Sequence, residues 1–251
     1  MAAWQQLSEE LNRWHDRGRI ATFWWRDDDA TRASPELARL LTIGAEQDVP
    51  VALAVIPRDV DGSLRELLTA YPRAAVLQHG WSHENHAPSE ERQEEHGPHR
   101  PRAIMAEELA EGWRRIAAMP GALPVLVAPW NRFDPELLPM LPSIGLCGIS
   151  TLGPRGAAEP APGVRRTNVH IDIMDWRGTG GFFGDDRVLD QVLQHLVARR
   201  CGTADAAEPT GLMTHHLFHD DGCWRFIARF LSHTRNHPAV RWLDAREAFW
   251  P

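Results

Sequence analysis

The chain contains the stretch IATFWWRDDD at residues 20–29, where an apolar run rich in β-branched and aromatic residues ends in three adjacent aspartates. Its apolar part, Ile20–Arg26, predicts a buried strand. Three neighbouring carboxylates repel one another, so Asp27, Asp28 and Asp29 are costly at a strand end unless a cation neutralises them. The stretch therefore predicts a cation site at the end of a strand. An exposed acidic turn that caps the next helix is the alternative, and Arg26 could neutralise part of the charge.

Apolar runs of the same type recur along the chain and alternate with amphipathic segments of helical length. This alternation predicts parallel strands covered by helices, and a chain of 251 residues can form them as one domain. We therefore expect an α/β fold in a single domain over residues 1–251, namely an irregular (β/α) barrel of seven or eight parallel strands, similar to a TIM barrel. The expected strands are Ile20–Arg26, Val51–Ile56, Ala74–Gln78, Pro124–Ala128, Gly145–Ser150, Arg166–Ile171, Gly211–Thr214 and Val240–Leu243. The expected helices are Pro35–Gln47, Gly62–Ala70, Ala103–Met119, Pro135–Leu141, Arg187–Arg199 and Cys223–Thr234.

Composition and charge exclude several classes of partner. The formal net charge is −7, and no basic patch is available to bind nucleic acid or an anionic membrane. No segment is long and apolar enough to span a bilayer, and Ala3–Arg19 has helical periodicity rather than the unbroken apolar core of a signal peptide. The three cysteines are far apart and odd in number, which indicates reduced thiols. We expect a cytoplasmic protein that binds neither nucleic acid nor membrane; the sequence leaves its oligomeric state open.

Unusual polar and aromatic residues follow the predicted strands at the point where each strand ends. In barrels of parallel strands, the carboxyl ends of the strands meet on one face, and the active site forms there. We therefore expect a single site that combines the aspartate run with residues that follow four later strands. These residues are His79, His83, Pro129, Trp130, Asp175, Trp176 and His215.

The segment QHGWSHENH at residues 78–86 places His79 and His83 four residues apart. At this spacing the two imidazoles would share one face of a helical turn and could chelate an ion together with a carboxylate. Such a ligand set leaves coordination positions free for water, as hydrolysis requires. We expect one divalent ion, with zinc favoured, although cobalt, nickel, manganese or iron would fit the same ligands. A structural histidine pair is the alternative for this spacing taken alone.

The segment THHLFHDD at residues 214–221 carries two adjacent histidines at the end of another predicted strand. Successive side chains of a strand point to opposite faces, so we expect one of His215 and His216 to face the site. Histidine is the usual general acid near neutral pH, and His215 is the candidate for that role. A buried structural histidine is the alternative reading.

Five tryptophans adjoin these motifs, and flat indole faces at the mouth of a cleft suit the apolar faces of sugar rings. For any single one of them, a position in the core is the favoured alternative. The five are Trp24, Trp25, Trp81, Trp130 and Trp176.

These motifs and their order resemble those of the polysaccharide deacetylase family, the NodB-type carbohydrate esterases, over most of the chain. Asp28–Asp29 is similar to the family's aspartate pair, His79–His83 to its His-[Ser/Thr]-x-x-His motif, Asp175–Trp176 to its Asp-Trp element, and Thr214–His215 to its final strand-end histidine. The resemblance implies Asp28 as the general base, His215 as the general acid, and Asp29, His79 and His83 as metal ligands. Supporting or substrate-binding roles are expected for Arg26, Asp27, Trp81, Trp130, Asp175 and Trp176.

The chain departs from the family pattern at three positions. The family's Arg-x-Pro-[Tyr/Trp] motif appears as Val127–Trp130, so the arginine that tunes the base is missing, and Arg26, Arg132 or Arg177 is the candidate substitute. Ala30 stands where the family commonly has glycine. The third aspartate allows a second register, with Asp27 as the base and Asp28 as the ligand. We favour Asp28 and Asp29, because the second register leaves Asp29 without a role.

The resemblance implies a metal-dependent deacetylase that removes an acetyl or related acyl group from a saccharide amide or ester by attack of metal-bound water. Its partner would then be a small saccharide or another acylated small molecule. A small intracellular non-sugar amide is the alternative substrate, because polymer-acting deacetylases usually need export. A non-catalytic carbohydrate-binding protein that keeps the barrel is the second alternative, and the missing arginine supports it.

Overall fold

The computed structural model describes residues 2–251, and its strands form one parallel sheet. The strands are β1 (Ala21–Ala30), β2 (Ala52–Val55), β3 (Ala75–His79), β4 (Ala122–Val127), β5 (Gly148–Ser150), β6 (Arg165–Arg166), β7 (Ile171–Asp172), β8 (Thr210–Thr214) and β9 (Val240–Trp242). Their order is β6-β5-β4-β3-β2-β1-β8-β7, and β9 pairs with the beginning of β1. All these pairings are parallel. The predicted α/β class with a parallel sheet is confirmed.

A single extended segment, residues 165–172, joins the two ends of this strand order. β6 at its beginning pairs with β5, and β7 at its end pairs with β8. Between them, the amide of Val169 donates to the carbonyl of Thr151 at 3.0 Å, and the amide of His170 donates to the carbonyl of Gly211 at 2.8 Å. The segment therefore bonds to neighbouring strands on both edges and curls the sheet into an irregular barrel, as the sequence predicted.

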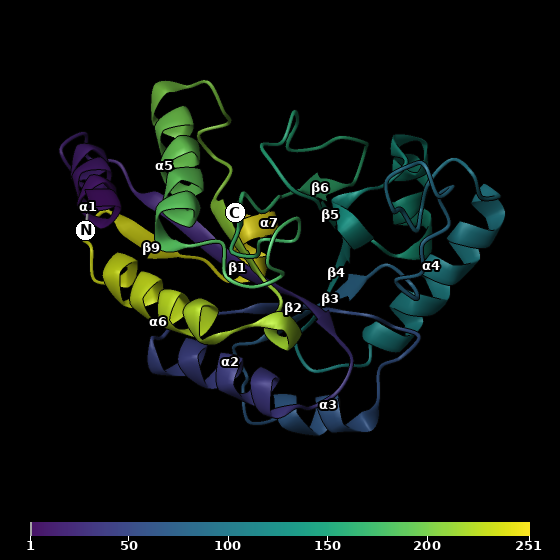
Figure 1. Cartoon of the computed structure of the whole chain (residues 1–251). Coiled ribbons are helices and arrows are strands. Elements are labelled where there is room, and N and C mark those ends of the chain that lie inside the picture. Colours follow the sequence, from purple (N-terminus) through teal and green to yellow (C-terminus); the bar gives the residue numbers. More distant parts are fainter. Residues whose placement is uncertain (1) are drawn as a thin grey trace.

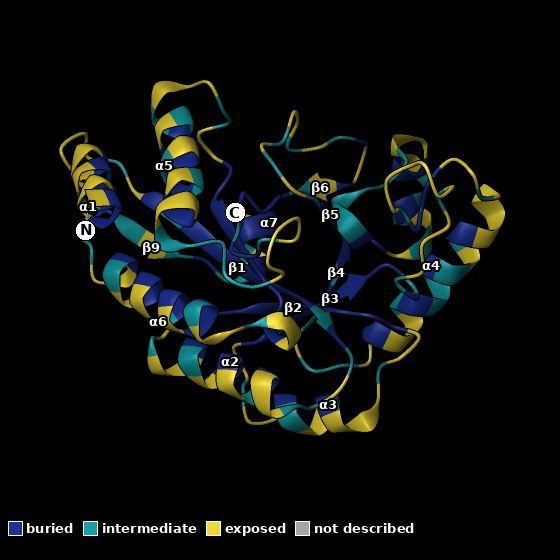
Figure 2. Cartoon of the chain, viewed as in Figure 1, coloured by how far each residue is buried: buried dark blue, intermediate teal, exposed yellow. Residues whose placement is uncertain are grey.

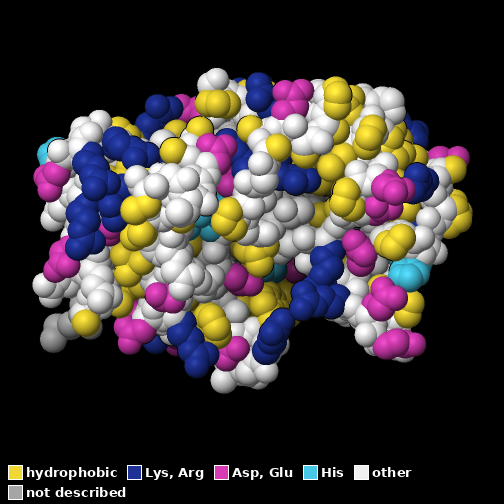
Figure 3. Space-filling view, turned by 90° about the horizontal axis from the view of Figure 1, so that it is seen from above, with side chains coloured by type: hydrophobic (Ala, Val, Ile, Leu, Met, Phe, Trp, Pro, Cys, Tyr) yellow, Lys and Arg dark blue, Asp and Glu magenta, His cyan; other side chains and the backbone are white. Residues whose placement is uncertain are grey.

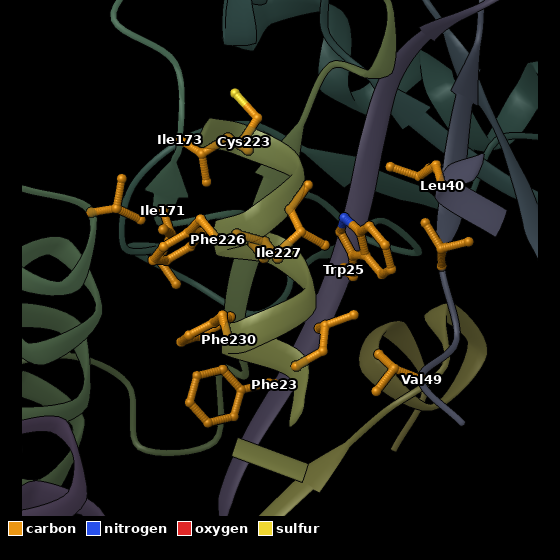
Figure 4. Close-up of a cluster of buried hydrophobic side chains, with 14 of the residues drawn as sticks. Phe23, Trp25, Leu40, Val49, Ile171, Ile173, Cys223, Phe226, Ile227 and Phe230 are labelled. Carbon is orange, nitrogen blue, oxygen red and sulfur yellow. The ribbon is translucent and has the colours of Figure 1, made fainter. Parts of the chain in front are cut away.

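The alternation of side chains along β1 separates the inside of the barrel from its outer layer. Trp24 is buried in an inner cluster that includes Val127 of β4. Phe23 and Trp25 point the other way, into the outer cluster, where α6 covers them (Figure 4). The ring of Phe230 on that helix lies 6.0 Å from the ring of Phe23, nearly edge-on at 78°. Two apolar layers therefore fix the orientation of β1.

Helices cover the outside of the barrel, with their apolar sides on the buried strands and their polar sides in solvent (Figures 1 and 2). They are α1 (Ala2–His15), α2 (Pro35–Glu46), α3 (Gly62–Leu68), α4 (Arg102–Ile116), α5 (Asp185–Cys201) and α6 (Asp221–Arg235). The last helix, α7 (Ala245–Phe249), instead packs on the inner cluster with Trp24. The 3₁₀ helices are η1 (Pro129–Asn131), η2 (Pro135–Ile144) and η3 (His216–Phe218). The helix expected near 135–141 is the 3₁₀ helix η2, because Pro139 and Pro142 inside it lack the amide hydrogens of a regular α-helix. The sequence did not predict α7.

The N-terminal helix α1 lies beside α5, at the edge of the molecule in Figure 1. The indole nitrogen of Trp4 donates to Asp185 at 2.7 Å, and Trp14 is buried. The periodic apolar residues of this segment therefore belong to the core of the domain. Within residues 2–251, no helix combines the length and the hydropathy that crossing a membrane requires.

The predicted end of β1 at Arg26 is wrong. The strand continues to Ala30, so the three aspartates lie inside it rather than after it. Its register against β2 shifts between Asp27 and Ala30, and Asp29 has a positive φ of 70°. A bulge of this kind bends a strand and redirects a side chain, and bulges are frequent next to active sites.

Candidate metal centre and active site

The carboxyl ends of the strands surround a cavity of about 600 Å³. Asp28 and Asp29 reach it from β1, His79 from the end of β3, and His215 from the residue after β8. The structure thus places residues from three distant parts of the sequence around one space. The other residues that line it are His83, Gln93, Trp130, Asn131, Arg132, Leu152, Asp172, Trp176, Arg177, Met213 and Phe218.

Three of these side chains form a cluster suited to a metal ion. The Oδ1 atom of Asp29 lies 3.2 Å from Nε2 of His79 and 3.5 Å from Nε2 of His83. The three donor atoms all lie within 4.8 Å of one another. Asp29 Oδ1 is buried and has no hydrogen-bond partner among residues 2–251. A buried carboxylate oxygen without a donor is costly, and a cation held by these three residues would satisfy it.

The hydrogen bonds of His79 leave the correct ring nitrogen free for an ion. Its Nδ1 lies 3.0 Å from the carbonyl of Val127, which can only accept, so Nδ1 carries the proton. Its Nε2 then presents a lone pair towards Asp29. A metal-ligating histidine commonly donates its other N–H to a backbone carbonyl in this way, which fixes the ring orientation. The orientation of the His79 ring therefore suits a metal ligand.

The electrostatics of the cluster show strong coupling between its members. Burial alone would raise the pKa of Asp29, but the neighbouring imidazoles, with His79 first, hold it below its ordinary value. Burial and the nearby His79 lower the pKa of His83 to about 4. The carboxylate is thus ionised and one imidazole is neutral near pH 7, as metal coordination requires.

The loop that carries His83 is not the helical turn expected from the His-x-x-x-His spacing. Gly80 has a φ of +54° directly after β3, and a Cβ at this position would overlap the carboxylate of Glu95 and the ring of Pro129. Glu95 holds the loop by accepting hydrogen bonds from the amide and the hydroxyl of Ser82, at 2.6 and 3.0 Å. A tight turn, fixed from outside by a buried glutamate, therefore brings His83 next to His79.

Asp28 is paired with Arg26 inside the barrel. The two residues stand on the same face of β1, and two N–H groups of Arg26 donate to the two carboxylate oxygens, each at 2.8 Å. The same guanidinium donates to Ser150 and Asn131. Arg26 is completely buried, and Asp28 is 2% exposed. Of the three arginines considered from the sequence, Arg26 is the one that contacts Asp28.

Asp27 points away from the cavity and belongs to the outer layer. It accepts hydrogen bonds from the hydroxyl of Thr214 at 2.6 Å and from Nδ1 of His216 at 2.5 Å. Burial would lower the pKa of His216, but the charge of Asp27 raises it, so the two form a buried ion pair. The geometry disfavours the second register, because Asp27 does not line the cavity and Asp29 does.

His215 faces the cavity while His216 faces Asp27, as alternation along the strand predicts. The Nε2 atom of His215 lies 3.9 Å from Oδ2 of Asp28. The edge of the Trp176 ring packs on His215, with ring centroids 4.8 Å apart. The general-acid candidate therefore lies beside the base candidate.

The structure places Asp172 rather than Asp175 at the cavity. Asp172 accepts a hydrogen bond from the indole nitrogen of Trp176 at 2.9 Å, and burial raises its pKa. Asp175 is outside the lining and holds the turn that follows it, through a bond from Gly178 to its carbonyl. Sequence reasoning missed Asp172, although a usable signal was present: it directly follows the predicted strand Arg166–Ile171.

The five tryptophans near the motifs divide between the core and the cavity. Trp24 and Trp25 are buried core residues. Trp81 is half-buried and stacks under Arg115, 4.8 Å from its ring centre, outside the cavity. Trp130 lines the cavity and packs on His83 at 4.2 Å, and Trp176 lines it with 47% of its surface exposed. Trp130 and Trp176 are therefore the two that could contact a substrate.

A second group of nitrogen and oxygen donors, His170, His195 and Glu208, is buried beneath α5. The amide of Gly211 donates to Nδ1 of His170 at 3.0 Å, so the proton of a neutral His170 is on Nε2, which faces Glu208 at 3.4 Å. Coordination through Nε2 would require an imidazolate. We therefore interpret this group as a buried structural His–Glu pair with a second histidine stacked on it at 3.4 Å.

No protein-family model matches the chain, and no curated protein matches it. Solved structures do match. A protein from Mycobacterium smegmatis assigned to the polysaccharide deacetylases aligns with a TM-score of 0.57 and 14% identity over 92% of this chain and 90% of that chain. A family 4 carbohydrate esterase from Streptomyces lividans, in complex with acetate, aligns with a TM-score of 0.54 and 14% identity over 88% and 90%. A mutant of a CE4 family pseudoenzyme, with restored enzymatic activity, aligns with a TM-score of 0.59 and 13% identity over 92% of this chain and 68% of that chain. The chain thus has the fold of the NodB-type polysaccharide deacetylases.

Proposed function

We propose that this chain is a divalent-metal-dependent hydrolase that removes an acetyl or related acyl group from a saccharide amide or ester. The observation that carries the proposal is the meeting, in one cavity, of a ligand cluster (Asp29, His79 and His83) with a carboxylate and a second histidine. Solved structures of the same fold include deacetylases and carbohydrate esterases, which supports the reaction class.

The residues present fit a divalent ion of the zinc type. They offer two imidazole nitrogens and one carboxylate oxygen, the set used by hydrolytic zinc sites that keep a position open. The orphaned oxygen of Asp29 and the tautomer of His79 are independent signs of such an ion. When bound, the ion would lower the pKa of a water molecule and polarise the acyl carbonyl.

Asp28 and His215 are the proposed acid–base groups. Asp28 would take the proton of the attacking water, and Arg26 holds its two oxygens in one orientation. His215, 3.9 Å from Asp28, would deliver a proton to the departing amine or alcohol. The ring of Trp176 packs on His215, and its indole nitrogen donates to Asp172.

A binding protein without activity is the competing proposal, and one structure of similar fold is a CE4 family pseudoenzyme. The main support for a binding protein from the sequence is that position 127, where the family motif has arginine, is valine. The contact between Arg26 and Asp28 weakens this support, because a buried guanidinium pairs with the carboxylate from another position. The hydrolase is therefore the better supported proposal.

The test compares metal content and turnover in three variants of the reconstituted protein, assayed on acetylated saccharides and on simple amides. Asp28→Asn should hold one ion per chain and lose turnover, whereas His83→Ala should lose both. The matched control is His86→Ala, which removes an exposed histidine of the same loop and should keep both. Turnover in Asp28→Asn, or a full complement of ion in His83→Ala, would contradict the assignment. Saturable saccharide binding with no turnover under several metals would favour the binding protein.

A further inference from the structure

Two arginines in the wall of the cavity have no acidic partner. Arg132 and Arg177 both line the cavity, and neither forms an ion pair within the part of the chain that the structure describes, residues 2–251. Arg132 is half-buried and donates one hydrogen bond, to the carbonyl of Gln93 at 2.8 Å. This bond fixes the direction of the guanidinium and leaves its other N–H groups free.

The negative charges of the same cavity are already compensated. Asp28 is neutralised by Arg26, and Asp29 belongs to the ligand cluster. Asp172 has a raised pKa through burial and is bonded to the indole of Trp176. Since the acids at the floor have partners, the charges of Arg132 and Arg177 remain available for a ligand.

The surroundings of Arg132 work against its positive charge. Burial lowers its pKa, and the charges of Arg92 and Arg177 lower it further, against a smaller opposing effect of Glu94. Arginines gathered in one place repel one another, and an oxyanion between them would relieve that repulsion with charge-assisted hydrogen bonds. Figure 3, seen from above, shows basic side chains bordering a recess at the lower edge of that face, and every one of them is arginine, because the chain contains no lysine.

A strained turn places Arg132 in the wall. Trp130 and Asn131 have φ values of +51° and +57°, which non-glycine residues adopt rarely and at a cost. The consequence is that three successive residues, 130–132, all line the cavity. Trp176 and Arg177 line it as a second neighbouring pair. The lining therefore contains two indoles and two guanidinium groups, from Trp130 and Arg132 and from Trp176 and Arg177.

We propose that the mouth of this cavity binds an anionic substituent of the substrate, a carboxylate or a phosphate, through Arg132 and Arg177. The inference rests on the proposed function and narrows it to acylated saccharides or amides that carry a negative charge near the scissile group. The guanidinium fork suits the paired oxygens of both anions, and the indoles of Trp130 and Trp176 would contact the neighbouring ring.

The kinetic test uses three matched N-acetylated saccharides, one neutral, one with a carboxylate and one with a phosphate, and compares the native chain with the double variant Arg132→Gln/Arg177→Gln. We expect the native chain to prefer at least one anionic substrate, and the double variant to lose that preference about tenfold or more in kcat/KM, mainly through KM. Added salt should raise KM for the anionic substrates more than for the neutral one. The carboxylate and phosphate arms tell the two anions apart.

The matched control is Arg39→Gln/Arg225→Gln, which removes two exposed arginines from α2 and α6. It should keep the native preference. A second measurement does not depend on turnover: calorimetric binding of the same three saccharides to the Asp28→Asn variant, with and without the two cavity arginines.

Equal treatment of neutral and anionic saccharides by the native chain, in both kinetics and calorimetry, would overturn the anion site while leaving a deacetylase in place. Arginine-dependent binding of the anionic saccharides without hydrolysis would support the anion site and contradict the proposed function. The two failures are thus distinguishable.

Discussion

Replacing Arg26 with methionine removes the guanidinium that neutralises Asp28 and leaves a side chain of similar length in the barrel. The two residues are 0% and 2% exposed, so the carboxylate would stay buried with no counter-charge. Breaking a buried ion pair from one side costs about 3–5 kcal/mol. Domains of this size typically have about 5–15 kcal/mol of stability. We therefore expect Arg26→Met to fold at low temperature, to lose about 3–5 kcal/mol in unfolding free energy and to lose turnover.

The assay is urea unfolding of the metal-free native chain, of Arg26→Met, of Asp28→Asn and of the double variant, together with metal content after reconstitution. Removing both charges should recover much of the loss, so the double-mutant cycle should give a coupling energy of about 2 kcal/mol or more. Metal content should stay at one ion per chain, because the side chain of Arg26 donates to Asp28 and to none of the three proposed ligands. A loss below about 1 kcal/mol, or additive effects in the cycle, would refute the reasoning.

Three other predictions follow from single contacts. Gly80→Ala forces a side chain into crowded space at positive φ and should weaken metal affinity about tenfold or more. Gly18→Ala, at φ +61° in open space, is the control for backbone strain alone. Equal zinc affinity in both variants would contradict the prediction. Asp27→Asn breaks a buried ion pair and should lower stability by about 3 kcal/mol yet retain the ion, whereas Asp29→Asn should lose it. Metal titrations in which Asp29→Asn keeps the ion and Asp28→Asn loses it would restore the second register. Burial, and then the charge of neighbouring groups, lowers the pKa of His195 to about 2 in the folded chain, below the unfolded value of about 6.5. As the pH falls below about 6.5, the unfolded chain binds a proton at His195 and the folded chain does not. Folding stability is therefore full above about pH 6.5 and decreases as the pH falls. Between pH 6.5 and 4.5 the native chain should lose about 2–3 kcal/mol more than His195→Gln in urea unfolding, and parallel pH dependences would count against it.

The arrangement of strands and helices could be predicted from the sequence because each apolar run has the length and composition of a buried strand. The boundaries of β1 could not be predicted in the same way. Asp27, Asp28 and Asp29 have low strand propensity, and three interactions hold them in the strand. The pair of Asp28 with Arg26 is local, whereas the pair of Asp27 with His216 and the cluster of Asp29 with His79 are long-range. Long-range partners decided where the strand ends.

The composition of the site was predictable to the extent that its residues follow strand ends. The loop after β3 was not, because a four-residue spacing suits a helical turn as well as a tight loop. The choice depends on two residues. Gly80 has a positive φ, which turns the chain away from the direction of β3, and Glu95, in the irregular segment after the loop, accepts the hydrogen bond of the Ser82 amide. Gly80 lies between the two histidines, but Glu95 does not, so the sequence around His79 and His83 carries only part of that information.

The position of Arg26 explains how Asp28 is paired with an arginine although valine, Val127, stands where the family motif has arginine. Val127 lies on β4 and is buried in the inner cluster. Arg26 lies on β1 itself, two residues before Asp28, and residues two apart share one face of a strand. The pair is therefore a local feature, an Arg-x-Asp sequence on the inward-facing side of β1, and it needs no second strand to form. Under the proposed function, a chain of this fold with arginine at neither position should leave the carboxylate that corresponds to Asp28 without a counter-charge.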